Sequence, residues 1–139
     1  MRKADKSELR GNKIFNPDTI EGTDILRKEI PDELQDWHKF CKISELHYNH
    51  IFDEKYNNNI FYMDLMLSDN YYNYSIKLYL FNVTGKLSFD MDNGFYGGLT
   101  IDDCSDWGYE NHCRFLISSL ECDIESEIYC ERIRVELVR

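Results

Sequence analysis

Side chains follow a period of two residues within the stretch Tyr74–Phe89. Ile76, Leu78 and Leu80 fall on one side of an extended segment. A period of two residues with β-branched and aromatic neighbours is typical of a strand rather than a helix. Large side chains occupy the second side as well, so we expect an interior strand with material packed on both faces of its sheet. This second side carries Lys77, Tyr79 and Phe81.

The same alternation recurs along most of the chain after residue 43. It predicts a mainly β fold of about seven strands, arranged as an antiparallel sandwich or a strongly curved sheet with an N-terminal helix against it. Further strands are expected near residues 44–52, 60–67, 87–91, 99–101, 113–118, 124–130 and 132–137. The residues expected to be buried in strands are Ile76, Leu78, Leu80, Leu87, Phe89, Leu99, Ile101, Ile133, Val135 and Leu137.

The turn between two of these strands predicts their register. Asn93-Gly94 is typical of a two-residue type I′ hairpin turn. Strict pairing outward from this turn would mix the two faces of the hairpin, whereas one extra residue at Gly97-Gly98 places Leu99 opposite Phe89. We therefore predict a hairpin with a β-bulge at the two glycines.

The N-terminal part of the chain differs from the rest. Residues 1–24 are polar and charged, so we expect a loosely held arm in front of a single β-rich domain, residues 25–139. Thr23 is expected to cap a short helix that stops before Pro31. Apolar residues at helical spacing predict a second helix over residues 32–41, lying on the sheet.

Acidic residues outnumber basic ones by 26 to 16, which gives a formal net charge of −10. Seven basic and six acidic residues fall within 1–30, which leaves nine and twenty, a net −11, for residues 31–139. A folded part this acidic repels phosphate backbones and disfavours nucleic acid as a partner. Acidic surfaces also serve solubility alone. No apolar run approaches the ~18 residues of a membrane span and no secretion leader precedes the chain, so no membrane partner is expected.

No motif has the spacing of a metal or catalytic site. The stretch Asp90–Gly94 begins like a calcium loop, but Ile101 stands where that loop needs a glutamate. His47 and His50 point to opposite faces of a strand, and no serine lies in a G-x-S-x-G elbow. The five cysteines, without a C-x-x-C pair, favour buried thiols in a reducing cytoplasm. We therefore expect a cytoplasmic, non-enzymatic protein without metal or cofactor; a Cys–His nucleophile pair assembled in space stays as an alternative.

The loop Asp102–Asn111 has the composition of a protein-binding site. It carries one tryptophan, Trp107, among several acidic residues. An aromatic anchor with charged residues around it is typical of protein–protein contacts. The alternative is that Trp107 folds back and covers the end of the sheet. The partner-binding residues expected are Asp103, Asp106, Trp107 and Glu110.

Four short segments resemble the pattern of small β-rich bacterial proteins grouped as immunity proteins of polymorphic toxin systems. These segments, within residues 43–138, are Leu80–Val83, Leu87-x-Phe89, Gly98–Asp102 and Tyr129–Val135. The resemblance implies a cytosolic binding protein that neutralises a toxin, with a basic toxin domain as partner. The alternative function is a small-ligand or carbohydrate-binding β domain, for which the ten tyrosines could supply aromatic platforms.

Overall fold

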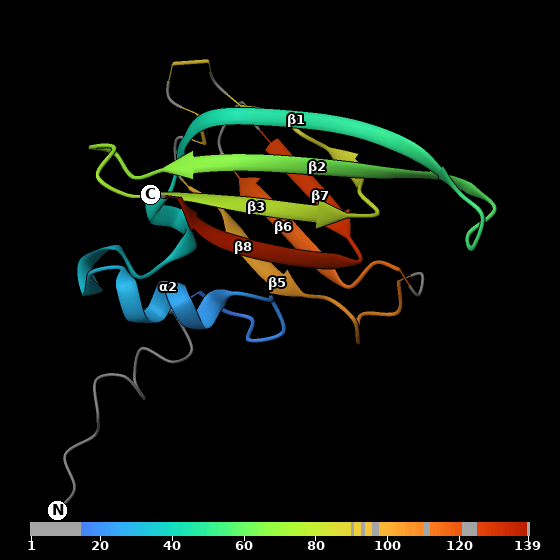
Figure 1. Ribbon diagram of the computed structural model, residues 1–139, viewed down its shortest axis with the longest axis horizontal. Helices are drawn as coiled ribbons and strands as arrows, with labels where there is room; N and C mark the ends of the chain where they lie inside the picture. Colours follow the sequence, from blue (N-terminus) through green and yellow to red (C-terminus); the bar gives the residue numbers. More distant parts are fainter. Residues whose placement is uncertain are drawn as a thin grey trace, which may run out of the picture.

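The computed structural model describes residues 15–89, 91–92, 94–95, 98–109, 112–120 and 125–138. Its strands form two antiparallel four-stranded sheets, with the orders β1-β2-β3-β8 and β4-β7-β6-β5 (Figure 1). In Figure 1 the second sheet lies behind the first, and β6 and β7 run steeply across it. This arrangement confirms the mainly β, antiparallel fold expected from the sequence, with a helix near the N-terminal end.

The first sheet contains β1 (Lys42–Asp53), β2 (Asn58–Ser68), β3 (Ser75–Phe81) and β8 (Arg132–Val138). β3 lies between β2 and β8, so the interior strand is confirmed. Leu78 pairs with Leu65 on one side and Val135 on the other, and all three side chains are almost fully buried. This row of apolar side chains across three strands forms one side of the hydrophobic core.

The second sheet contains β4 (Thr84–Lys86), β5 (Thr100–Asp103), β6 (Phe115–Leu120) and β7 (Glu125–Cys130). Ile101, Ile117 and Ile128 align across β5, β6 and β7 and are buried. They belong to the same hydrophobic cluster as the inward residues of the first sheet, so the two sheets share one core.

The expected core is largely confirmed. Leu99 is buried but lies just before a strand, and Leu137 is half-buried within one. Leu87 and Phe89 are half-buried and lie outside any strand, so for these two the prediction is wrong. The residues confirmed as buried in strands are Ile76, Leu78, Leu80, Ile101, Ile133 and Val135.

The second face of β3 is covered by arginine side chains rather than by another layer of the protein. The guanidinium carbon of Arg134 lies 4.0 Å from the ring centre of Tyr79, and that of Arg132 lies 4.2 Å from the ring centre of Phe81. Cation–π contacts of this kind stabilise aromatic rings that are partly exposed to solvent. The expectation of packing on both faces of the sheet is therefore wrong.

The predicted hairpin over residues 87–101 is also wrong. β4 pairs with β7 and β5 pairs with β6, so β4 and β5 lie at opposite edges of the second sheet. The chain between them crosses to residues 38–41, just before β1, where the Phe95 N–H donates to the Cys41 carbonyl over 2.8 Å. A turn-forming dipeptide fixes a local bend, but the partner of each strand is chosen by non-local packing.

Gly98 has a role different from the predicted bulge, and Asn93 and Gly97 lie outside the described residues. Gly98 has a φ of 87°, and a Cβ added to it would lie 2.4 Å from the carbonyl oxygen of His38. A residue other than glycine would therefore be strained in its own backbone and would collide with a neighbouring one.

The helix before Pro31 is confirmed as α2 (Thr23–Glu29), but Gly22 is its N-cap, and the Thr23 hydroxyl donates to the Ile20 carbonyl over 3.2 Å. The predicted helix over residues 32–41 is wrong. The chain forms two short 3₁₀ turns there, η1 (Asp32–Leu34) and η2 (Trp37–Lys39). Between them the buried Gln35 amide donates to carbonyls at the end of α2, which holds the chain against α2 and prevents a continuous helix.

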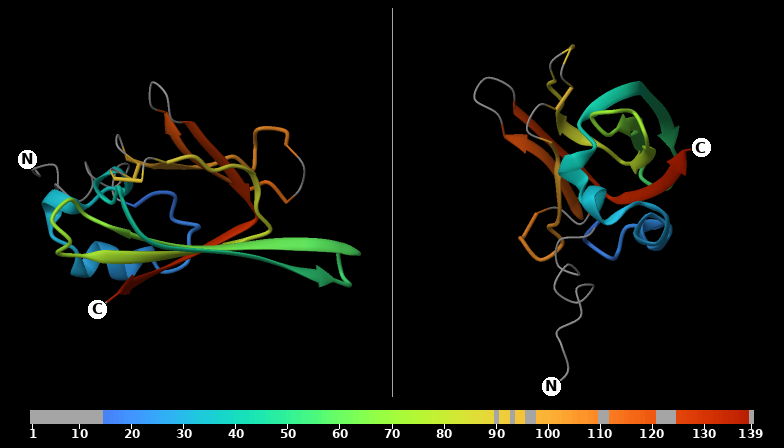
Figure 2. Two further views of the ribbon diagram at one scale, coloured as in Figure 1. Left: turned by 90° about the horizontal axis from the view of Figure 1, so that it is seen from above. Right: turned by 90° about the vertical axis from the view of Figure 1, so that its left-hand side faces the viewer.

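The boundary of the predicted arm is wrong, because residues 15–24 belong to the folded domain. Phe15 and Ile20 are almost fully buried, and the Trp37 indole N–H donates to the Asn16 carbonyl over 2.6 Å. Glu21 forms a parallel bridge with Arg134, so this segment and α2 lie beside β8 (Figure 2). A few apolar side chains in a polar segment are enough to close the end of the core. Residues 1–14 of the predicted arm lie outside the described residues.

Candidate functional site

The loop after β5 is fixed by Asp103. Its Oδ1 accepts hydrogen bonds from the Ser105 N–H at 3.0 Å and the Ser105 hydroxyl at 2.6 Å, and its Oδ2 accepts one from the Thr19 hydroxyl at 3.4 Å. The bond from the Ser105 hydroxyl is the main reason why the pKa of Asp103 is lowered. Asp103 is therefore committed to holding the loop and tying it to the N-terminal segment.

Three aromatic side chains, which we call the aromatic cluster, meet beyond this turn: Trp107, Tyr109 and Tyr129. The backbone N–H of Trp107 donates to the Cys104 carbonyl over 3.0 Å, and the residue is 51% exposed. The rings of Trp107 and Tyr109 have centroids 6.2 Å apart, and those of Tyr109 and Tyr129 have centroids 5.2 Å apart. Trp107 therefore stands half in solvent and does not fold back under its own chain.

The hydroxyl group of Tyr129 is also affected by the loop residue Tyr109. A hydrogen bond with the Tyr109 side chain, together with burial, raises the pKa of the Tyr129 hydroxyl to about 12. Both effects favour the protonated phenol of Tyr129 over its ionised form. The loop and β7 are thus joined by the edge-on contact between the rings of Tyr109 and Tyr129.

Carboxylates lie on the same side of the second sheet as the aromatic cluster. Asp102 is opposite Leu116, and Leu116 is opposite Tyr129, so Asp102 and Tyr129 share the outer face of the sheet. Glu127 precedes Tyr129 by two positions and shares this face, and Asp106 precedes Trp107 in the loop. All three carboxylates are exposed. The candidate site therefore has aromatic side chains at its centre and acidic side chains around them.

The structure brings together part of the predicted site and adds to it. Asp106 and Trp107 lie side by side on the exposed loop, and Glu110 lies outside the described residues. The sequence-based interpretation missed Tyr109 and Tyr129. The alternation of Ile128 and Cys130 as inward residues would have placed Tyr129 on the outer face, but nothing in the sequence indicated that the loop would reach it.

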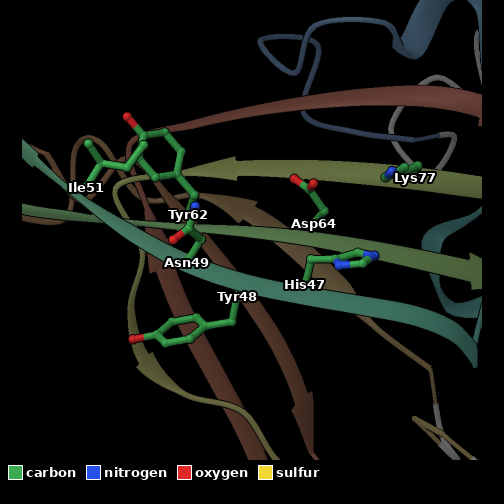
Figure 3. A pocket seen from close by; sticks show the side chains of 7 residues that line it. All are labelled: His47, Tyr48, Asn49, Ile51, Tyr62, Asp64 and Lys77. Atoms are coloured by element: carbon green, nitrogen blue, oxygen red, sulfur yellow. The ribbon is translucent and has the colours of Figure 1, made fainter.

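A second surface lies on the open face of the first sheet. It is an open depression of about 540 Å³ lined by His47, Tyr48, Asn49, Ile51, Tyr62, Asp64 and Lys77. Figure 3 shows His47, Asn49, Tyr62 and Asp64 on one side of the β1–β2 hairpin, with Tyr48 on the other side. His47 is directly opposite Asp64 in the strand register. The depression offers hydrogen-bonding groups of several kinds, but the two aromatic rings are not on one face.

Three cysteines lie close together where β5 and β7 end and β6 begins. The Cys104 thiol donates to the Cys113 carbonyl over 3.4 Å, and both thiols contribute to raising the pKa of Cys130, although burial is the main cause. Burial also raises the pKa of Cys104. Raised values keep thiols protonated and poorly nucleophilic. Within the described residues, no group of three histidine, cysteine or acidic side chains is placed to hold a metal ion. Cys122 lies outside that part of the chain.

Comparisons of the chain with protein-family models, with curated proteins and with solved structures gave no match. In the part of the chain that the structure describes, no helix is long and apolar enough to cross a membrane.

Proposed function

We propose that this protein is a non-enzymatic binding protein that engages a protein partner through the aromatic cluster. The observation that supports this proposal is the half-exposed Trp107 ring, held in place by Tyr109, which is itself fixed against Tyr129. Tryptophan and tyrosine are the side chains most often found at the energetic centre of protein interfaces. A ring that is already positioned loses little conformational freedom on binding.

The partner that this site suits best is a basic protein. Asp102, Asp106 and Glu127 border the aromatic cluster, and residues 31–139 carry a net charge of −11. Complementary charge speeds association and orients the partner before contact. The resemblance to immunity proteins adds the specific proposal that the partner is a basic bacterial toxin domain, which this protein neutralises by covering its surface.

The chain holds two tryptophans, and their different exposures allow a direct test. Trp37 is 3% exposed in the core, whereas Trp107 is 51% exposed. In protein labelled with 5-fluorotryptophan, the ¹⁹F signal of Trp107 should shift or broaden when the basic product of the adjacent reading frame is added. The signal of Trp37 serves as the internal control and should stay unchanged. Binding without a change at Trp107 would contradict the site, and absence of binding would contradict the proposed partner.

The depression on the first sheet favours a second candidate, a small polar ligand such as a neutral disaccharide. Its size falls in the range of small-molecule sites, and His47, Asn49 and Tyr62 are among the residues that line it (Figure 3). Cellobiose at millimolar concentration should then shift the backbone amide signals of these residues, and Tyr62→Ala should remove the effect. Unchanged signals would leave the aromatic cluster as the sole candidate site.

A further inference from the structure

The two edges of the first sheet differ in how they are covered. At the β8 edge, the Glu21 N–H donates to the Ile133 carbonyl over 3.1 Å, and the Glu21 carbonyl accepts from the Val135 N–H over 2.8 Å. At the other edge, β1 pairs with β2, and among the described residues no further strand pairs with β1. An uncovered edge strand offers its main-chain donors and acceptors to another strand.

One hydrogen bond determines which groups of β2 face β1. The Phe61 carbonyl accepts the Val83 N–H over 3.0 Å, so the main chain of Phe61 points away from β1, toward the β3 side. Main-chain groups of successive strand residues point in opposite directions. Those of Ile60 and Tyr62 therefore point toward β1.

The outward-facing main-chain groups of β1 belong to alternate residues of its second half. Ile51 and Asn49 are the partners of Ile60 and Tyr62, so they use their main-chain groups within the sheet. The His50 N–H accordingly donates to the Asn49 side-chain oxygen, over 2.8 Å, and not to β2. The main-chain groups of β1 that face outward, away from β2, therefore belong to Tyr48, His50 and Phe52.

Apolar side chains flank this free edge. Tyr48, Ile51 and Phe52 are each more than half exposed, and the Tyr48 ring stacks on Phe61 with centroids 5.8 Å apart. The β-bulge of β1 lies at its other end, near Ile43, and the β1–β2 hairpin projects beyond the rest of the molecule (Figure 2). Prolines, lysines or bulges that normally protect such an edge are absent from residues 46–53.

We propose that β1 pairs antiparallel with β1 of a second copy of the chain, about a two-fold axis that passes through His50 perpendicular to the sheet. The two four-stranded sheets then form one continuous sheet of eight strands, and the interface is closed by its symmetry. The pairs across the interface join His47 to Asp53, Tyr48 to Phe52, Asn49 to Ile51 and His50 to itself.

Charge complementarity selects both the occupant and this register. The axis at His50 places Asp53 of each copy opposite His47 of the other. An axis at Asn49 would place Asp53 opposite Glu45, which repel each other. An axis at Ile51 would place Lys55 opposite His47 and Asp53 opposite Asn49, so the pairing of His47 with Asp53 of the second copy would be lost. Of these three registers, the one centred on His50 is the one that places His47 opposite an acidic residue of the second copy.

The interface is small, so we expect a dissociation constant on the order of micromolar. β1 lies at the opposite edge of the first sheet from β8 and on a different sheet from β5, which leads into the Trp107 loop (Figure 1). The dimer is formed by a strand of the first sheet and the aromatic cluster lies on the second sheet, so the inference does not rest on the proposed function.

Analytical ultracentrifugation of the full chain over a range of micromolar concentrations tests the dimer. The wild-type protein should reach the mass of two chains, and Phe52→Lys should remain a single chain. Two substitutions at His47 should act in opposite directions: His47→Asp should weaken the dimer roughly fivefold or more, and His47→Lys should strengthen it. A fold defect cannot produce this opposition, and Tyr71→Lys, on the turn between β2 and β3 at the end of β1 remote from residues 47–53, is the matched control that should leave the dimer unchanged.

A single chain at every concentration would overturn the proposal. So would a dimer that tolerates Phe52→Lys, or a series of open-ended oligomers in place of a closed dimer. Circular dichroism of each variant, unchanged from the wild type, confirms that a lost dimer is not an unfolded chain.

Discussion

The ring of Tyr109 meets the ring of Tyr129 edge-on, with centroids 5.2 Å apart and an angle of 74° between the ring planes. This contact joins a loop to a strand of the second sheet and leaves the neighbouring Trp107 half-exposed. An edge-to-face pair is a favourable arrangement of two aromatic rings. The position of the proposed binding residue thus depends on a tyrosine pair that lies beside it.

The first prediction concerns ionisation of this pair. The pKa of Tyr129 is raised to about 12, mainly by its hydrogen bond with Tyr109. Tyr109→Phe should therefore lower the pKa of Tyr129 toward the ordinary tyrosine value, as measured from the Tyr129 Cζ chemical shift in ¹³C-labelled protein. Tyr48→Phe, on the other sheet, is the control and should leave it unchanged.

The same raised pKa has a consequence for stability. Because the folded state holds the Tyr129 proton more tightly than the unfolded chain, this contribution is fully present below pH 10. It is lost as the pH rises from about 10 to about 12. In Tyr109→Phe the loss should be smaller over this interval, and an identical pH profile for both proteins would contradict the contribution of Tyr109 to the raised pKa of Tyr129.

The second prediction concerns the centre of the first sheet. Leu78→Ala removes a fully buried side chain between β2 and β8 and should lower the free energy of unfolding by roughly 2–5 kcal/mol. Lys77→Ala, the neighbouring residue on the open face, should cost about 0.5 kcal/mol or less. Urea denaturation measures both, and equal effects would contradict the assigned faces of β3.

The third prediction concerns Gly98. Gly98→Ala should lower the free energy of unfolding by about 1–3 kcal/mol, because the residue has a positive φ and its Cβ would strike the His38 carbonyl. Gly108→Ala is a matched control, since Gly108 also has a positive φ but a Cβ there meets nothing within 4 Å. The difference between the two variants measures the backbone contact apart from the conformational strain.

The interior strands could be predicted from the sequence because their side-chain period reports burial directly. The positions of Ile76, Leu78 and Leu80 at every second residue follow from the burial of one side of β3. The same holds for Ile133 and Val135 of β8. The open face of β3 could not be predicted, since a tyrosine beneath an arginine and a tyrosine beneath a second layer give the same pattern.

The parts that failed depend on contacts between distant segments. Asn93-Gly94 resembles a hairpin turn, yet β4 and β5 find β7 and β6 as partners. Apolar residues at helical spacing in 32–41 reach the core from two 3₁₀ turns. Likewise, the sequence identified Trp107 as a candidate but did not reveal that Tyr129 would complete its cluster.

The most direct test of the proposed binding site is a kinetic one, with surface binding of the basic product of the adjacent reading frame at low and high salt. Trp107→Ala should speed dissociation about 30-fold or more with little change in association. Asp102→Asn combined with Asp106→Asn should instead slow association at low salt, and the difference should vanish at high salt because salt screens exposed charges.

Asp103 is left intact because it holds the loop. Tyr71→Ala, an exposed aromatic on the turn between β2 and β3, should match the wild type. Dissociation from Trp107→Ala at the wild-type rate would contradict the account.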